Sequence, residues 1–238
     1  MASSLPLPRY DVVRAGRALA ALLRDPDDLP QVFTLIDSMS GTAPARLLLG
    51  FRRSEAGPRL LRERPDIGAR LADREGLRAL PAGSLGRAYL AFVEREGISA
   101  EGIRTASEQS EATGYASDEM NFLRSRMRDT HDLWHAVTGY QGDVLGELAL
   151  LAFTLGQHWN SAIAAIVGAG ILKGFSRGAT PFVWEGFRRG RAAAWLPAQP
   201  WESLLALPLE DVRTRLRVGS PPVYSPLRTA ELRAEGIV

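Results

Sequence analysis

The sequence contains no cysteine in 238 residues, which excludes a disulfide framework, a thiolate metal site and a cysteine nucleophile. Lysine is nearly absent as well, because arginine supplies 28 of the 29 cationic side chains and Lys173 is the exception. The 29 cationic and 27 acidic residues leave a formal net charge of +2, and no basic block interrupts this balance. Such a chain is a poor candidate for a nucleic-acid-binding protein.

Long hydrophobic segments are also missing. The most apolar stretch, Leu148–Leu172, is interrupted by polar residues, and its uninterrupted part from 162 to 172 has 11 residues. A membrane-spanning helix needs roughly 20. The N-terminus lacks the apolar core of a secretory signal and carries an early acidic residue, Asp11, which also argues against a long transit peptide. We therefore expect a protein that is soluble or peripheral to a membrane.

Strand signals are scarce, because runs rich in valine, isoleucine and threonine are few. Apolar residues instead recur at helical spacing between proline, glycine and capping residues. The pattern predicts an all-α fold, a single-domain helical bundle over residues 1–238. The expected helices cover 10–24, 29–39, 44–51, 84–96, 118–138 with Asp118 as its N-cap, a helix that starts after Asp143 and runs into 148–172, 182–194, 201–207 and 209–216, while 65–77 stays ambiguous.

Only three histidines occur, His131, His135 and His158, and all lie within 28 residues. His131 and His135 are four positions apart in a predicted helix, so their imidazoles project from one face about one turn apart, as in helix-borne zinc sites. Asp132 lies about 100° around that helix from His131. It is placed either to reach the same metal from the edge of that face or to orient an imidazole.

Glu147 follows His135 by 12 residues, a separation of roughly 18 Å on one continuous helix. Gly139 and Gly142 lie between them and allow the chain to reverse, which would turn Glu147 toward both histidines. The combined set of two imidazoles and two carboxylates suits zinc or another divalent first-row metal, held between two central helices. On spacing alone, metal binding and a chance pair of buried histidines remain about equally supported.

Three further residues are candidates for the lining of a substrate channel. Trp134 lies between the two histidines and either packs in the core or shields the site from water. His158 is 11 residues beyond Glu147, roughly 16 Å along the helix, so it is either a locally bonded core histidine or a channel residue. Gly168 belongs to a run of small residues that favours close helix packing, with a lipid groove as the alternative.

The motif His131-Asp-x-x-His135, followed after 11 residues by Glu147, resembles the signature of the Coq-four family of ubiquinone (coenzyme Q) biosynthesis proteins. The resemblance covers about residues 10–218. The segments that carry it are Leu80–Gly86 with Tyr89, Asp118-Glu119, Arg124–Thr130, Val144–Glu147, Trp201–Leu209 and Asp211–Arg213. Two departures are Gln141, where a proline is usual in the family, and Arg128-Asp129, where Arg-Glu is usual. Neither departure changes a ligand position.

This resemblance implies an all-helical protein with a divalent metal, usually zinc, held by the residues that match His131, Asp132, His135 and Glu147. It implies decarboxylation at C1 of a polyprenylated hydroxybenzoate, either simple or oxidative with hydroxylation. The metal would act as a Lewis acid, and Asp132 is the candidate for proton transfer. With the family in view, we expect the apolar stretch around Gly168 to form one wall of a groove for the prenyl tail.

The resemblance also implies prenyl-lipid binding, peripheral membrane contact and the organisation of other ubiquinone biosynthesis enzymes into a complex. It leaves a homo-oligomer open. The replacement of lysine by arginine favours a high-GC bacterial source, hence the bacterial cytoplasm at the inner membrane. A eukaryotic relative would lie on the matrix side of the mitochondrial inner membrane.

Two other functions compete with this one. A metal-dependent hydrolase of the zincin type would need a glutamate as base where Asp132 stands, and a helical His-Asp phosphohydrolase would need a histidine upstream of His131. A non-catalytic scaffold that binds prenyl lipids around a structural or vestigial metal is the second alternative. A structural zinc site is closed by four protein ligands, whereas a catalytic site keeps an open position.

Overall fold

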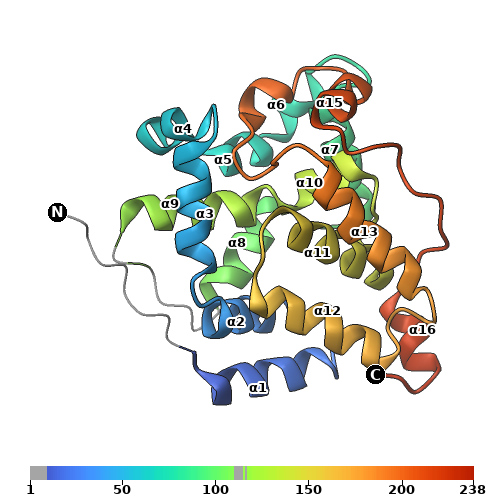
Figure 1. Cartoon of the computed structure of the whole chain (residues 1–238). Coiled ribbons are helices and arrows are strands. Elements are labelled where there is room, and N and C mark those ends of the chain that lie inside the picture. The colour runs from blue at the N-terminus through green and yellow to red at the C-terminus, as the bar shows by residue number, and fades with distance from the viewer. Residues whose placement is uncertain (1–9, 110–114, 116) are drawn as a thin grey trace.

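The computed structural model describes residues 10–109, 115 and 117–238. All regular secondary structure in these ranges is helical, apart from one isolated antiparallel bridge, so the all-α prediction is confirmed (Figure 1). The helices are α1 Val12–Leu22, α2 Leu29–Met39, α3 Ala43–Arg53, α4 Gly57–Glu63, α5 Ile67–Ala72, α6 Arg74–Arg78, α7 Leu85–Glu96, α8 Ala100–Gln109, α9 Asp118–Asp129, α10 His131–Thr138, α11 Val144–Gln157, α12 Ser161–Lys173, α13 Thr180–Ala192, α14 Trp201–Leu204, α15 Leu209–Leu216 and α16 Thr229–Ala234.

The long helix expected over 118–138 is divided at Thr130 into α9 and α10. The threonine hydroxyl donates a hydrogen bond to the carbonyl of Arg126 at 2.8 Å, a side-chain bond that commonly bends helices. The expected cap was also wrong by one residue, because Ser117 occupies the N-cap position and Asp118 lies in the first turn. The ambiguous segment 65–77 contains α5 and α6.

The apolar stretch beyond Asp143 forms two helices, where the sequence suggested one continuous run. Asp143 is the N-cap of α11 as expected, and its carboxylate accepts from the backbone at the helix start. A second helix start follows at Asn160, whose side chain accepts hydrogen bonds from the N–H groups of Ala162 and Ile163. Helix α11 therefore ends at Gln157, and the cap at Asn160 starts α12 as a separate helix.

Helix α11 lies at the centre of the molecule and contacts α10, α12 and α13 (Figure 1). Its packing with α13 depends on two glycines. A Cβ on Gly186 would lie 2.4 Å from the carbonyl oxygen of Ala149, and one on Gly190 would lie 2.1 Å from that of Phe153. Because no side chain fits there, the two helix backbones approach closely, and α11 is held firmly where α10 folds back against it.

Candidate metal centre

The fold-back that the glycines suggest is present between α10 and α11. Gly139 follows α10 with a φ of 83°, and its N–H donates to the carbonyl of His135 at 2.8 Å. Glycine adopts this left-handed conformation without strain. The chain then reverses, and Asp143 starts α11 with Glu147 in its first turn.

The reversal brings Glu147 to both imidazoles. Its carboxylate oxygens lie 3.0 Å from Nε2 of His135 and 3.7 Å from Nε2 of His131. On the α10 side, His131, Asp132 and His135 each offer one ligand atom, and these atoms lie within 4.8 Å of one another. All four residues expected to hold a metal therefore lie together, although their metal-binding role stays a prediction.

His135 is the most rigidly held member of the set. Its Nδ1 lies 3.1 Å from the carbonyl oxygen of Tyr140, which only accepts hydrogen bonds, so Nδ1 carries the proton. Phe92 stacks on the imidazole with ring centroids 5.0 Å apart. Nε2 is buried and points at the Glu147 carboxylate, 3.0 Å away. The ring orientation is thus fixed from the Nδ1 side, and Nε2 is aimed into the candidate ligand set.

Opposite charges shift the pKa values of two other candidate ligands, His131 and Glu147. Burial of His131 opposes protonation, but the hydrogen bond to Asp132 and the charge of Glu147 outweigh it and raise the pKa of His131 to about 9. Burial likewise raises the pKa of Glu147, but the charges of His135 and His131 lower it to about 2. The carboxylate is therefore ionised and ready to act as a ligand. Two imidazole nitrogens and two carboxylates fit zinc or a similar divalent ion.

A large cavity of about 830 Å³ opens beside this set. His131, Asp132 and Glu147 line it, whereas the side chain of His135 lies behind them and is fully buried. The other walls are largely apolar. They include Leu19, Val32, Phe33, Ile36, Leu148, Leu151, Ile163 and Ile166.

The channel residues expected from sequence divide into two groups. Trp134 and His158 line the cavity. Gly168 does not: it is exposed on α12, and a Cβ there would meet no atom within 4 Å. Gly170 lines the cavity instead. Because successive helix residues are rotated by about 100°, two positions along the helix reverse the side that a residue faces.

His158 lies at the C-terminal end of α11, away from the ligand set as expected. Both ring nitrogens are buried without a hydrogen-bond partner in the part of the chain described. Burial and the positive charge of Arg46 lower the pKa of His158 to about 4. His158 is therefore a neutral side chain in the cavity wall.

The C-terminal segment, residues 219–238, carries no residue that the sequence singled out, yet it contacts the start of α11. Tyr224 donates its hydroxyl to Asp143 Oδ2 at 2.6 Å, and the N–H of Leu227 donates to Oδ1 at 2.8 Å. Arg228 forms an ion pair with Glu96 at 2.7 Å and lines the cavity. The few apolar residues of segment 219–238 lack a clear helical period. The sequence therefore provides little indication of the structure of this segment.

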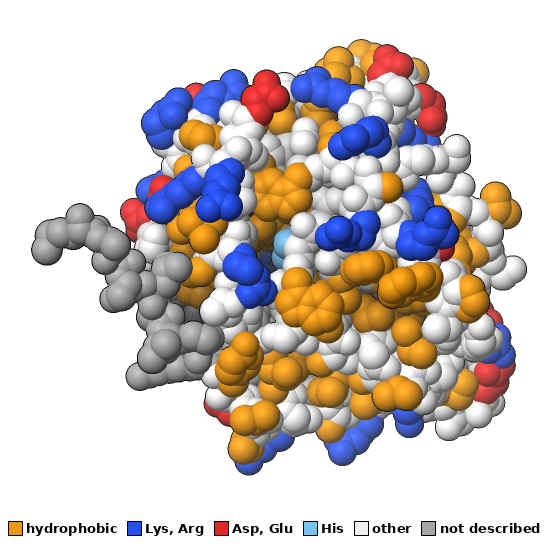
Figure 2. All heavy atoms as spheres, in the orientation of Figure 1, with side chains coloured by type: hydrophobic (Ala, Val, Ile, Leu, Met, Phe, Trp, Pro, Cys, Tyr) orange, Lys and Arg blue, Asp and Glu red, His pale blue; other side chains and the backbone are white. Residues whose placement is uncertain are grey.

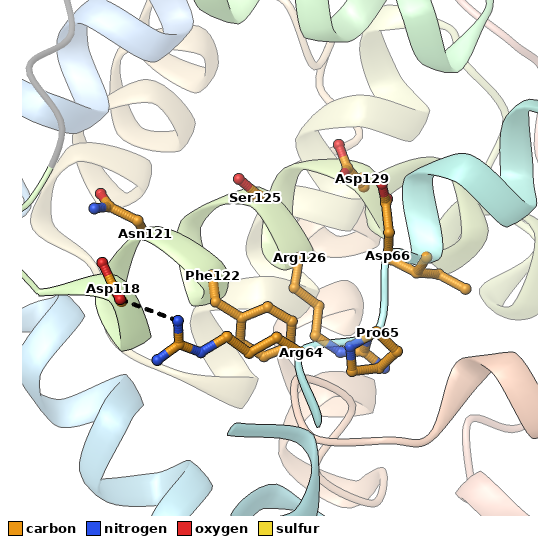
Figure 3. A pocket seen from close by; sticks show the side chains of 10 residues that line it. Arg64, Pro65, Asp66, Asp118, Asn121, Phe122, Ser125, Arg126 and Asp129 are labelled. Atoms are coloured by element: carbon orange, nitrogen blue, oxygen red, sulfur yellow. Dashed lines mark hydrogen bonds and ion pairs between the residues drawn. The ribbon is translucent and has the colours of Figure 1, made fainter. Parts of the chain in front are cut away.

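A smaller pocket of about 430 Å³ lies on the opposite face of α9 (Figure 3). Arg64 and Asp118 form an ion pair across it at 3.2 Å. The buried Arg126 binds both carboxylate oxygens of Glu202, at 2.7 and 3.0 Å, and so ties α9 to α14. The charged groups of this pocket thus serve packing between helices.

Comparisons with known proteins identify the family of this chain. Residues 9–222 match the family model described as coenzyme Q (ubiquinone) biosynthesis protein Coq4. The mitochondrial ubiquinone biosynthesis protein coq4 of Aspergillus flavus is 32% identical over 226 residues, covering 90% of this chain and 74% of the relative. The corresponding protein of Talaromyces stipitatus is 30% identical over 240 residues, covering 94% and 78%.

A solved structure supports the fold independently. It is the crystal structure of a Nostoc punctiforme protein provisionally described as a ubiquinone biosynthesis protein, with a TM-score of 0.63 and 23% identity. The match covers 89% of this chain and 100% of the other. From the family match and the curated relatives, the chain belongs to the Coq4 family of coenzyme Q (ubiquinone) biosynthesis proteins.

Proposed function

We propose that this protein removes the C1 carboxylate of a polyprenylated hydroxybenzoate on the way to ubiquinone, with zinc or a similar divalent ion held by His131, Asp132, His135 and Glu147. The observation that carries the proposal is the position of the candidate ligands. Three of the four line a large apolar cavity, so a substrate with an apolar tail and a charged head has a place for each part.

The apolar walls account for the prenyl tail. Leucine, isoleucine, valine and phenylalanine side chains from α1, α2, α11 and α12 line the cavity. Burying an isoprenoid chain there releases its hydration water, which is the main driving force for lipid binding. The tail would fix the ring next to the polar wall that carries His131 and Asp132.

The ligand set accounts for the chemistry. A bound divalent ion would supply Lewis acidity for the negative charge that develops on the ring as carbon dioxide leaves. Asp132 is buried, and its Oδ1 lies 3.3 Å from Nδ1 of His131, which places a proton-sharing pair at the cavity wall. In the simple reaction an Asp132 that is not bound to the ion would pass the proton it shares with His131 to the ring carbon that loses the carboxylate. The apolar walls exclude bulk water during this step.

The surface agrees with peripheral membrane contact, the source we propose for the lipid substrate. Hydrophobic side chains gather over α12 and α13 among scattered arginines (Figure 2). Trp159 precedes α12, Leu172 lies on α12 and Trp184 lies on α13, and their side chains are 58%, 90% and 61% exposed. Aromatic and leucine side chains of this kind are typical of the membrane interface. In the described ranges, no helix has the length and apolarity needed to cross a bilayer.

Partners and location follow from the same family. We propose that the protein works beside other ubiquinone biosynthesis enzymes at the membrane surface. The fungal relatives are named as mitochondrial proteins. For this chain we propose the cytoplasmic face of a bacterial inner membrane, because its arginine-rich composition favours a high-GC bacterial source.

The first test is metal content by elemental mass spectrometry for the wild type, His135→Ala and the control His158→Gln. We expect about one divalent ion per chain in the wild type and the control, and its loss in His135→Ala while circular dichroism stays helical. The loaded protein should then convert a polyprenylated hydroxybenzoate, and product mass distinguishes replacement of the carboxylate by hydrogen from replacement by hydroxyl. A wild type that takes up no metal after reconstitution would refute the mechanism and favour the lipid-binding scaffold.

A further inference from the structure

The wall of the cavity beside the candidate ligands carries a stripe of polar and charged side chains. Arg124, Arg128, His131 and Asp132 line the cavity from α9 and α10 at intervals of three and four residues. Thr130 keeps helical backbone angles between the two helices, and the N–H of Trp134 donates to its carbonyl at 3.0 Å. The four side chains therefore line one cavity wall on both sides of the α9–α10 junction.

Most arginines along this cavity are already matched with carboxylates. Each forms an ion pair with an acidic side chain near the cavity wall. These pairs are Arg124 with Asp37 at 3.4 Å, Arg228 with Glu96 at 2.7 Å, and Arg233 with Asp25 at 3.0 Å. In each of these three pairs a terminal guanidinium nitrogen contacts the carboxylate.

Arg128 differs in how it is held. Its Nε donates to Asp129 Oδ1 at 2.7 Å, and Asp129 belongs to the opposite face of α9, where it lines the small pocket of Figure 3. The Arg128 side chain is only 14% exposed and lines the large cavity. The structure gives it no further hydrogen bond or ion pair with the described residues. The guanidinium is thus anchored through Nε, and its two terminal nitrogens remain for a ligand.

The position of Arg128 relates it to the metal centre. It precedes His131 by three residues and Asp132 by four across the α9–α10 junction, and all three side chains line the same cavity. A guanidinium one turn before the ligands can reach an anionic group on a substrate that lies against them.

The charge balance of the site indicates which ligand group Arg128 could bind. A divalent ion held by Asp132 and Glu147 would have its two positive charges balanced by these carboxylates. An acidic substrate would therefore bring an uncompensated negative charge into an apolar cavity, which is strongly unfavourable without a partner. The terminal nitrogens of an arginine form a planar fork that matches both oxygens of a carboxylate.

We propose that Arg128 binds the ring carboxylate of the substrate and makes the cavity selective for the aromatic acid over its decarboxylated product. This inference rests on the proposed function, because it takes the aromatic acid as substrate. The reaction removes the group that Arg128 holds, so the product loses this contact while keeping its tail contacts. Arg128 thereby favours the exchange of product for a new acid.

The test compares two ligands, a farnesylated 4-hydroxybenzoate and the matching farnesylated phenol without the carboxylate. Their binding to the metal-loaded full chain is measured by quenching of tryptophan fluorescence, since Trp134 lines the cavity. The variants are Arg128→Gln and Arg128→Lys. Arg59→Gln is the matched control, because Arg59 is 53% exposed on α4 and paired only loosely with Glu63 at 3.9 Å.

We expect the wild type and Arg59→Gln to bind the acid at least about tenfold more tightly than the phenol, the range of a charge-assisted hydrogen-bonded pair. Arg128→Gln should weaken acid binding by that factor and leave phenol binding within about twofold, while Arg128→Lys keeps part of the preference. Retained phenol binding and metal content show that the variant is folded.

Three results would overturn the inference. An unchanged preference for the acid in Arg128→Gln would show that another group holds the carboxylate. An equal loss of both ligands would assign Arg128 to packing alone. A wild type that binds acid and phenol equally would remove the selectivity but leave lipid binding intact. Binding of neither ligand would instead refute the proposed function itself, and the inference with it.

Discussion

Replacing Asp143 with alanine should loosen two parts of the molecule at once, the start of α11 and the C-terminal segment. One carboxylate oxygen accepts the N–H groups of Leu145 at 3.1 Å and Gly146 at 3.2 Å, which caps the helix. The same oxygen accepts the N–H of Leu227 at 2.8 Å, and the other accepts the hydroxyl of Tyr224 at 2.6 Å. Asp143 is 2% exposed, so water replaces these bonds only after local opening.

The size of the effect follows from these contacts. Loss of a helix N-cap costs about 1 kcal/mol, and each hydrogen bond to a charged acceptor contributes about 1.5–3 kcal/mol. These contributions do not add fully, because the bonds share one carboxylate and the part-buried Tyr224 regains some hydration. We therefore expect Asp143→Ala to lower the free energy of unfolding by about 3–5 kcal/mol. Tyr224→Phe removes one donor and should lower it by about 1.5–2 kcal/mol.

Urea unfolding followed by tryptophan fluorescence measures both losses. Tyr10→Phe is the control, because Tyr10 is 54% exposed and its change should leave stability within about 0.5 kcal/mol. Since α11 carries Glu147, metal affinity should also fall in Asp143→Ala and stay unchanged in Tyr10→Phe. A loss below about 1 kcal/mol for Asp143→Ala would refute the reasoning, because the helix cap alone accounts for that much.

Three further changes test the site and its cavity. Glu147→Gln should lower metal affinity by at least about tenfold with little change in helicity, measured by titration with a competing chelator; unchanged affinity would remove Glu147 from the ligand set. Gly170→Leu should fill the cavity and weaken binding of a polyprenylated acid while sparing metal content, whereas the exposed Gly168→Leu should leave lipid binding unchanged; equal effects would contradict the assigned cavity wall. Because the pKa of His158 is lowered to about 4, the unfolded chain takes up a proton between pH 6.5 and 4 that the folded chain does not. As the pH falls through that window, this group should therefore lower the free energy of unfolding by up to about 1.4 kcal/mol per pH unit. Urea unfolding of His158→Gln should lack this part of the pH dependence.

The sequence was most informative where a local rule decides the geometry. The spacing of His131 and His135 puts both imidazoles on one helix face, and the glycines at 139 and 142 allow only a short reversal before Asp143 caps the next helix. These three signals were sufficient to place Glu147 opposite the histidines. Each depends on backbone geometry within a few residues, which is why sequence reasoning captured it.

Sequence reasoning failed where packing over a long distance decides. The side of α12 that faces the cavity depends on a helix start at Asn160 that was not foreseen, and Gly170 rather than Gly168 lies on that side. The contact of Tyr224 with Asp143 joins residues 81 positions apart, and no periodic pattern marks it. The role of Arg128 depends on which carboxylates pair with its neighbours, which only the folded chain reveals.

The arrangement of the ligand set also bears on whether this protein is an enzyme or a scaffold. A structural metal is surrounded by protein, whereas a catalytic one needs a face that a substrate can reach. Here His135 holds the rear of the set, fixed by Tyr140 and Phe92, while the other three candidate ligands line the cavity. The groups of His131, Asp132 and Glu147 that would hold an ion therefore face the same apolar space as the guanidinium of Arg128. An ion there that leaves Asp132 free would keep a position for substrate and favour an enzyme, whereas an ion closed by all four residues would favour a scaffold.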